Sequence, residues 1–282
     1  MPATVPAARP KLGPTRRSVV LTLVALLLTC LAPAARAQDW AKAKLDKSMR
    51  HREWVTIPYN GRKLQAFVVY PEVSHKAPVV LVVHEIFGLS DWARSMADDL
   101  AAQGYIAIVP DLLSGAGPHG GGSSDFPDMD STVKAVFQLD PRQVMSDLNA
   151  AAHYALSQPS ANGKLAVVGF CWGGGKAFEY ATLHKHLSAA YVFYGTPPVK
   201  EAMPAITAPV YGFYAGDDNR VTSTVAGTTA DMKADGKAYF PVVYPGAGHG
   251  FMRAGEAPDA TAANREARDK AWARLLRHLA TM

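Results

Sequence analysis

The feature that most constrains the fold is a series of short, nearly continuous apolar runs separated by longer amphipathic segments. Five such runs cover residues 78–85, 104–112, 164–171, 189–195 and 210–217. Strands that are covered by helices on both faces have this pattern, because neither side of the strand meets water. A sixth run, 238–246, contains Pro241. Because proline lacks the N–H group that a central strand donates, we expect this run near an edge of the sheet.

The segments between these runs have the spacing of helices. They cover residues 91–104, 141–158, 174–186, 223–236 and 262–280. Residues 53–71 differ, because two strand-like runs are joined there by Asn60-Gly61, a pair favoured in type I′ turns of antiparallel hairpins. Alternating strands and helices predict a mostly parallel, doubly wound sheet. The predicted fold class is therefore α/β: a mostly parallel sheet with an N-terminal antiparallel hairpin and helices on both faces.

The first 37 residues have the pattern of a cleavable export signal. A basic stretch with Arg16-Arg17 precedes the apolar run 19–32, and the small residues at 35–37 offer a cleavage site. The apolar run is too short and too close to that site for a membrane anchor. Paired arginines favour the twin-arginine route, and the general secretory route is the alternative. We expect a periplasmic or secreted protein that begins near Gln38 and has no membrane association after cleavage.

The charge distribution argues against a nucleic-acid partner. The chain has 29 basic and 24 acidic residues, but the expected signal holds five of the basic residues and none of the acidic ones. The remainder is balanced at 24 of each, so no basic surface for a polyanion is expected. Its composition is that of a soluble globular protein. We expect a polar lead-in over 38–52 and one domain over 53–282, as a monomer that binds a small molecule.

The residues at the strand ends carry the chemistry, because ligands of parallel sheets bind beyond the carboxyl ends of the strands. These ends hold His84-Glu85, Asp111, Cys171, Gly195, Asp217-Asp218 and His249. A nucleophile, an acid and a base in the order Cys, Asp, His match the order of the α/β-hydrolase triad, with either aspartate as the acid. Residues 169–173, Gly-Phe-Cys-Trp-Gly, have the spacing of the nucleophile elbow, where a strand turns sharply into a helix. The N-terminus of that helix favours a thiolate.

At these motifs the sequence resembles the dienelactone hydrolases (carboxymethylenebutenolidases). The resemblance covers roughly residues 53–280 and rests on "HEIFGLSDWARSMADDLAAQGYIAIVPDLL", "NGKLAVVGFCWGGGKAF", "YVFYG", "AGDDNRV" and "PGAGHGFMR". It implies a single-domain α/β-hydrolase fold, no cofactor, Cys171 as the nucleophile and His249 as the base. It also implies Asp218 rather than Asp217 as the acid, because the family pattern places the acid three residues before the valine matched by Val221.

Further site residues follow around this triad. A carboxylate at the end of an apolar strand is costly unless it is paired or used, and the resemblance implies that Glu85 contacts the cysteine and controls its ionisation. The backbone N–H groups of Ile86 and Trp172 are expected to form the oxyanion hole. Arg253 matches an arginine that holds a substrate carboxylate in the family, whereas a second arginine has no clear counterpart. The region between Asp111 and Arg142 departs from the family pattern, and we expect its glycine- and serine-rich loop, 114–131, to cover the site.

A cysteine nucleophile restricts the substrate. Sulfur is a good leaving group, so the tetrahedral intermediate reverts unless the alcohol departs easily. We therefore expect an activated, cyclic ester cleaved through an acyl-enzyme on Cys171. One alternative keeps the fold but acts as a general thioesterase or carboxylesterase. Another is a non-catalytic binding protein or thiol sensor. No histidine–carboxylate cluster has metal-ligand spacing, so no metal is expected.

Overall fold

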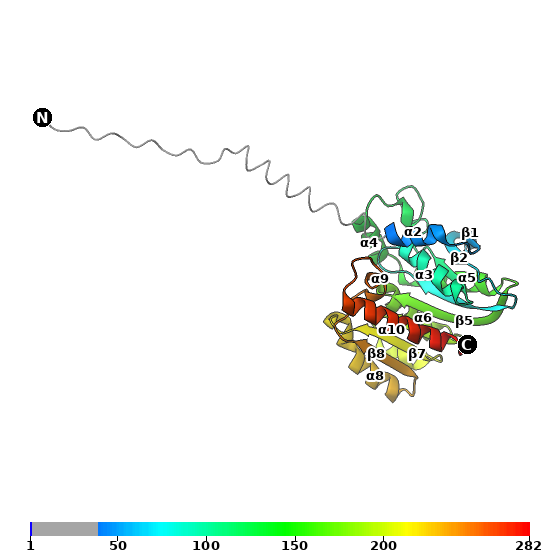
Figure 1. Cartoon of the computed structure of the whole chain (residues 1–282). Coiled ribbons are helices and arrows are strands. Elements are labelled where there is room, and N and C mark those ends of the chain that lie inside the picture. Colours follow the sequence, from blue (N-terminus) through cyan, green and yellow to red (C-terminus); the bar gives the residue numbers. More distant parts are fainter. Residues whose placement is uncertain (2–38) are drawn as a thin grey trace. The chain divides into compact units, whose positions relative to one another are not determined.

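The strands form one eight-stranded sheet in the order β1-β2-β4-β3-β5-β6-β7-β8 (Figure 1). This computed structural model describes Met1 and residues 39–282, so the expected export signal lies outside the described residues. The strands are β1 (Arg52–Tyr59), β2 (Arg62–Val69), β3 (Ala77–Val83), β4 (Ile106–Pro110), β5 (Ala161–Phe170), β6 (Ala189–Phe193), β7 (Val210–Ala215) and β8 (Tyr239–Tyr244).

The pairing of the strands confirms the predicted architecture. β1 pairs antiparallel with β2, and β2 pairs antiparallel with β4, whereas every pair from β4 to β8 is parallel. Asn60 and Gly61 turn the hairpin with φ of 45° and 77°, the left-handed conformation that a type I′ turn requires. β8, which contains Pro241, is an edge strand as expected.

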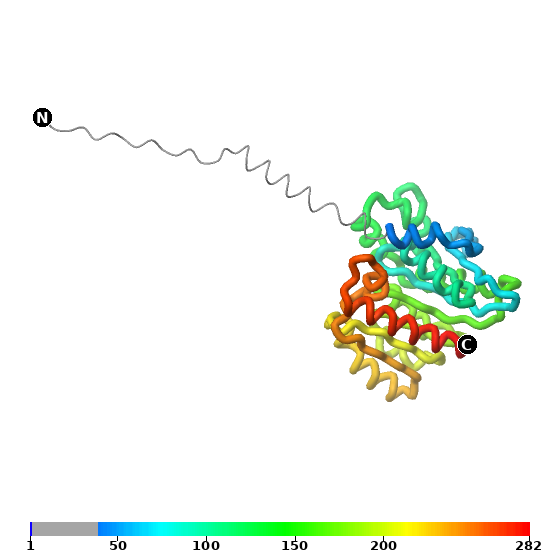
Figure 2. The backbone as a smooth tube through the Cα atoms, in the orientation of Figure 1, coloured from blue at the N-terminus to red at the C-terminus, as the bar shows by residue number. Residues whose placement is uncertain are grey.

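Helices cover both faces of this sheet. The main helices are α2 (Asp39–Lys47), α3 (Asp91–Ala102), α4 (Met129–Phe137), α5 (Pro141–Leu156), α6 (Trp172–Leu183), α8 (Thr224–Ala234) and α10 (Ala262–Leu279), with short turns η2 (Ser123–Asp125), η3 (Lys200–Ala205), α7 (Asn219–Thr222) and α9 (Phe251–Ala254). One core cluster joins the sheet to α3 and α10, and a second joins its other face to α5 and α6. Figure 2 shows the red C-terminal helix α10 running across the front of the sheet.

The structure contains two helices, α2 and α4, that the sequence pattern did not predict. The lead-in over 38–52 contains α2, whose Ala41 and Leu45 are buried. Helix α4 follows the glycine- and serine-rich loop and was not expected from the sequence, although the Asp128 carboxylate caps it by accepting a hydrogen bond from the Ser131 N–H at 2.8 Å. Within residues 39–282, no helix is both long enough and apolar enough to cross a lipid bilayer.

The register brings the carboxyl ends of the central strands together. Val83 at the end of β3 pairs with Gly169 of β5, and Phe170 at the end of β5 pairs with Phe193 of β6. The residues that follow these strands therefore lie side by side at one edge of the sheet, where a parallel sheet binds its ligand.

Candidate active site

Cys171 lies on a strained turn between β5 and α6. Its backbone has φ 56° and ψ −121°, a conformation that side chains rarely adopt. The flanking glycines permit the turn. A Cβ atom on Gly169 would lie 2.0 Å from the carbonyl oxygen of Gly173, and one on Gly173 would lie 2.3 Å from the carbonyl oxygen of His84. The residue spacing that predicted the elbow thus reflects close backbone contacts.

The structure brings Cys171, His249 and Asp218 together in one chain of contacts. The Nε2 atom of His249, in the loop between β8 and α9, lies 3.0 Å from the Cys171 sulfur. Its Nδ1 atom lies 2.5 Å from Oδ2 of Asp218. Asp218 is 7% exposed, whereas Asp217 is exposed to solvent and has no part in this chain of contacts. Of the two candidate aspartates, the geometry therefore selects Asp218.

The surroundings of Cys171 hold it as a neutral thiol. Burial, reinforced by the negative charge of Glu85, raises the pKa of the Cys171 thiol to about 11. The backbone N–H groups of Trp172 and Ile86 act in the opposite direction, because both point toward the sulfur and favour a negative charge there. These are the two groups expected to form the oxyanion hole.

Glu85 makes its ion pair with Arg253. The Nε group of Arg253 donates a hydrogen bond to Oε2 of Glu85 at 2.8 Å, and Glu85 is only 3% exposed. Burial raises the pKa of the Glu85 carboxyl, and the Arg253 guanidinium and the nearby Tyr194 hydroxyl oppose this rise. The guanidinium also lies 4.8 Å from the centre of the Phe87 ring. The arginine expected to hold a substrate carboxylate thus already has a carboxylate partner within the protein.

Two residues that sequence reasoning did not select belong to the site. Tyr194, which follows β6 with φ 39°, is buried and packs its ring edge-on against His249 at 5.1 Å between ring centres. Its position in the "YVFYG" strand end was the available signal. Arg220, on α7, lines the pocket, and its charge lowers the pKa of the Cys171 thiol against the larger effects of burial and Glu85. No sequence pattern indicated that role.

Two other strand-end residues do not line the pocket. His84 is fully buried, and its ring stacks on Trp172 with 5.9 Å between ring centres. The Asp111 carboxylate accepts hydrogen bonds from the Ser123 hydroxyl and N–H at 2.6 and 2.7 Å. It therefore fixes the glycine-rich loop rather than taking part in the chemistry.

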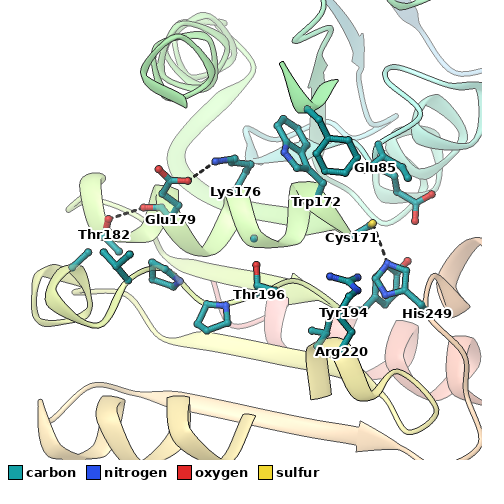
Figure 3. Close-up of a pocket in the computed structure, with 18 of the residues that line it drawn as sticks. Glu85, Cys171, Trp172, Lys176, Glu179, Thr182, Tyr194, Thr196, Arg220 and His249 are labelled. Carbon is teal, nitrogen blue, oxygen red and sulfur yellow. Dashed lines mark hydrogen bonds and ion pairs between the residues drawn. The ribbon is translucent and has the colours of Figure 1, made fainter. Parts of the chain in front are cut away.

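A pocket of about 950 Å³ opens above Cys171 (Figure 3). Its lining contains Glu85, Cys171, Arg220, His249 and Arg253 at one end and continues along α6. It includes none of residues 114–131, so the expectation that this loop covers the site is wrong; Phe137, at the end of α4, reaches the pocket instead. Among residues 39–282, no group of three or more His, Cys, Asp or Glu side chains is arranged to hold a metal ion.

Comparison with known proteins identifies the family of this chain. A family model described as "Dienelactone hydrolase family" matches residues 64–282. The chain belongs to this family. A relative of the dienelactone hydrolase family from Yersinia pestis, named "Putative carboxymethylenebutenolidase", is 35% identical over 214 residues, which are 70% of this chain and 77% of the relative. The "Carboxymethylenebutenolidase" of Pseudomonas putida is 30% identical over 205 residues, which are 69% of this chain and 83% of that protein.

The fold agrees with this assignment. The crystal structure named "Putative Dienelactone Hydrolase" from Klebsiella pneumoniae matches with a TM-score of 0.72 and 27% identity, covering 83% of this chain and 100% of that one. As a member of the dienelactone hydrolase family, the protein is a carboxylic ester hydrolase with an α/β-hydrolase fold.

Proposed function

We propose that the protein hydrolyses activated esters or lactones through an acyl-enzyme on Cys171, with His249 as the base and Asp218 as its orienting acid. The observation that carries this proposal is the continuous contact from Asp218 through His249 to the sulfur, at 2.5 and 3.0 Å. Contacts of this length are within reach for proton transfer. A thiol sensor needs neither the histidine nor the aspartate, so the geometry favours catalysis over that alternative.

The steps follow from the positions of the groups. His249 takes the thiol proton as the sulfur attacks the ester carbonyl, and the N–H groups of Ile86 and Trp172 stabilise the oxyanion. The proton then passes from His249 to the departing alcohol oxygen, which leaves a thioester on Cys171. Water attacks the thioester while His249 accepts its proton, and the sulfur departs and regains the proton. Acid and alcohol are released, and no cofactor is required.

A cysteine nucleophile favours an activated substrate, that is, an ester whose alcohol departs easily. A thiolate leaves a tetrahedral intermediate more readily than a simple alkoxide, so only an alcohol of low pKa competes with it. Enol esters, phenyl esters and enol lactones meet this condition, whereas amides and simple alkyl esters do not. A general carboxylesterase activity is disfavoured for the same reason, because the alcohols of simple alkyl esters depart less readily than the sulfur.

Glu85 and Arg253 supply a control on the thiol. The charge of Glu85 disfavours a thiolate in the free protein. A substrate that carries a carboxylate would compete with Glu85 for Arg253, since the guanidinium has further N–H donors on the pocket side. The displaced Glu85 would then move away from the thiol, and its charge would no longer oppose transfer of the thiol proton to His249. The nucleophile would thus become reactive when an anionic substrate is bound.

Mass spectrometry of the intact protein tests the proposal directly. A p-nitrophenyl ester or an enol lactone mixed with the protein at low pH and quenched in acid should add the acyl mass to Cys171, identified by peptide mapping. Hydrolysis of alkyl thioesters at equal or greater efficiency would favour the thioesterase alternative. If the protein hydrolyses none of a panel of lactones and activated esters, a binding or sensing role would remain.

We also propose that this hydrolysis takes place outside the cytoplasm. Support comes from the sequence alone, in the basic, apolar and small-residue order of residues 1–37. The balanced charge of the remaining chain is consistent with a small-molecule substrate, and no polyanion partner is proposed.

A further inference from the structure

The pocket extends far beyond the space around the reacting sulfur. From Cys171 it follows α6 past Lys176 and Glu179 to Thr182 and Leu183. Leu183 lies twelve positions after Cys171, which corresponds to about 18 Å along a helix. Figure 3 shows Lys176, Glu179 and Thr182 on the side of Cys171 away from His249, with Thr196 facing the helix across the gap. We call this extension the α6 arm.

The far end of the α6 arm is apolar and open to solvent. Leu183 and Val199 line it with exposed fractions of 59% and 70%, and Phe137, which is 65% exposed, lines the same pocket. These side chains come from three separate segments, namely the end of α4, the end of α6 and the loop before η3. Single exposed apolar residues are ordinary, but three that meet around one pocket form a binding surface.

The walls of the arm favour an uncharged occupant. The wall opposite α6 contains Pro197 and Pro198, which have no N–H group to leave unpaired when water is displaced. On the helix side, Lys176 Nζ lies 2.7 Å from Oε2 of Glu179. This ion pair neutralises both charges and leaves neither as the partner of a charged ligand.

The reacting groups determine which part of a substrate enters the arm. In the tetrahedral intermediate the oxyanion must face the N–H groups of Ile86 and Trp172. The leaving oxygen must lie near His249, which gives it a proton. The remaining substituent, the acyl chain, then points away from His249, which is the direction of the α6 arm.

We propose that the α6 arm binds an extended, uncharged apolar acyl substituent, so that the preferred substrate is larger than a small unsubstituted lactone. This inference rests on the proposed function, and Leu183 and Val199 are its specificity-determining residues. The pocket volume of about 950 Å³ lies at the upper end of the range of roughly 300–1,000 Å³ for small-molecule sites, which agrees with an extended ligand.

The test is a series of p-nitrophenyl esters from acetate to dodecanoate, in which the leaving group is constant. Each methylene that leaves water for the arm should raise kcat/KM by up to about fourfold. We expect the octanoate to exceed the acetate by at least tenfold, with a decline once the chain is longer than the arm. Acetyl esters of larger phenols should show no matching rise, because their bulk lies on the His249 side.

Substitutions at the solvent-exposed end of the α6 arm test whether the preference for longer acyl chains arises there. Leu183→Asp and Val199→Asp should each lower the octanoate-to-acetate ratio of kcat/KM by about tenfold, since a charge replaces apolar contact. Both positions are exposed, so the fold should tolerate them. Val73→Asp is the matched control, because Val73 is 39% exposed and lies outside the pocket; its ratio should equal that of the wild type.

The outcomes separate this inference from the proposed function. Hydrolysis of acetate without any gain for longer chains, or an unchanged ratio in both variants, would overturn the inference and leave the hydrolase intact. Failure to cleave any ester would overturn both. Sedimentation velocity of the wild type and of Val199→Asp tests the rival occupant. A dimer that the substitution dissociates would show that a second copy, and not an acyl chain, covers the apolar end.

Discussion

The guanidinium of Arg253 holds the carboxylate of Glu85 at 2.8 Å, close enough to Cys171 for its charge to act on the thiol. This ion pair keeps a buried negative charge close to the thiol, and that charge helps to raise the thiol pKa to about 11. The pair therefore opposes ionisation of the thiol in the free protein, although the sulfur already lies 3.0 Å from Nε2 of His249.

The first prediction concerns this restraint. The rate of Cys171 alkylation by iodoacetamide should be slow at pH 7 and rise about tenfold per pH unit toward the thiol pKa, since only the thiolate reacts. Glu85→Gln removes the charge that raises the pKa and frees the Arg253 cation. It should therefore increase alkylation at pH 7.5 by at least tenfold, increase sensitivity to peroxide, and lower turnover of anionic lactones.

Glu179→Gln is the matched control, because Glu179 is a carboxylate in the same pocket that pairs with Lys176. Its alkylation profile should follow that of the wild type. Superimposable profiles for the wild type and Glu85→Gln would show that Glu85 is a structural carboxylate without influence on the thiol.

Loss of the nucleophile or of its base should remove hydrolysis. Cys171→Ala and His249→Ala should each lower kcat/KM on an activated ester by at least about 1,000-fold, and the double variant should lose little more, because the two groups act as a unit. Circular dichroism should show an unchanged fold. Additive losses in the double variant would contradict a shared proton transfer.

The two neighbouring aspartates should differ sharply. Asp218→Asn should lower kcat by about 10³–10⁴-fold, since the amide no longer holds the His249 ring in the required tautomer. Asp217→Asn changes an exposed side chain and should alter kcat by no more than about twofold. Steady-state kinetics of both variants measure these changes. A larger loss of kcat in Asp217→Asn than in Asp218→Asn would mean that Asp217 orients His249 in solution.

The elbow glycines should be required for stability. Gly173→Ala places a Cβ 2.3 Å from the carbonyl oxygen of His84, and should cost about 3 kcal/mol or more of the free energy of unfolding. In α8 the corresponding Cβ at Gly227 would have no atom within 4 Å, so Gly227→Ala should stabilise by about 0.5–1 kcal/mol. Urea denaturation measures both changes. Equal stability of the two variants would show that the turn can relax.

Export should depend on the paired arginines. Replacement of Arg16 and Arg17 by lysine should keep the protein in the cytoplasm if the twin-arginine route is used. Cell fractionation and N-terminal sequencing provide the measurement, with the mature chain expected to begin near Gln38. Normal export of the double variant would indicate the general secretory route.

The features predicted from the sequence are those that short stretches of chain determine. The buried strands were visible because each is a single apolar run, and Asn60-Gly61 marked the hairpin because few residue pairs accept two positive φ angles. The elbow was visible because the glycines flanking Cys171 meet backbone atoms that any protein with this turn would place there. The triad order followed from the strand ends.

The features that were missed depend on segments far apart in the chain. Nothing local to Arg253 shows that Glu85, 168 residues earlier, is its partner. Phe137, Leu183 and Val199 likewise line one pocket although they come from separate segments, and each of them alone is an ordinary apolar residue. The sequence also does not show that the glycine-rich loop stays out of the pocket lining, because the hydrogen bonds that hold it join Ser123 to Asp111, twelve positions earlier.

Helix α6 has a consequence for redesign. Its first turn follows Cys171, and Lys176, Glu179 and Leu183 line the same pocket at successive turns. One turn of helix advances about 5.4 Å. A bulky side chain at one of these positions would close the pocket at a defined depth, and the next position would close it about one turn further out. Single substitutions along α6 would therefore set the longest acyl chain that the pocket accepts, in steps of about one helical turn. The turn at Cys171 would keep the sulfur in place.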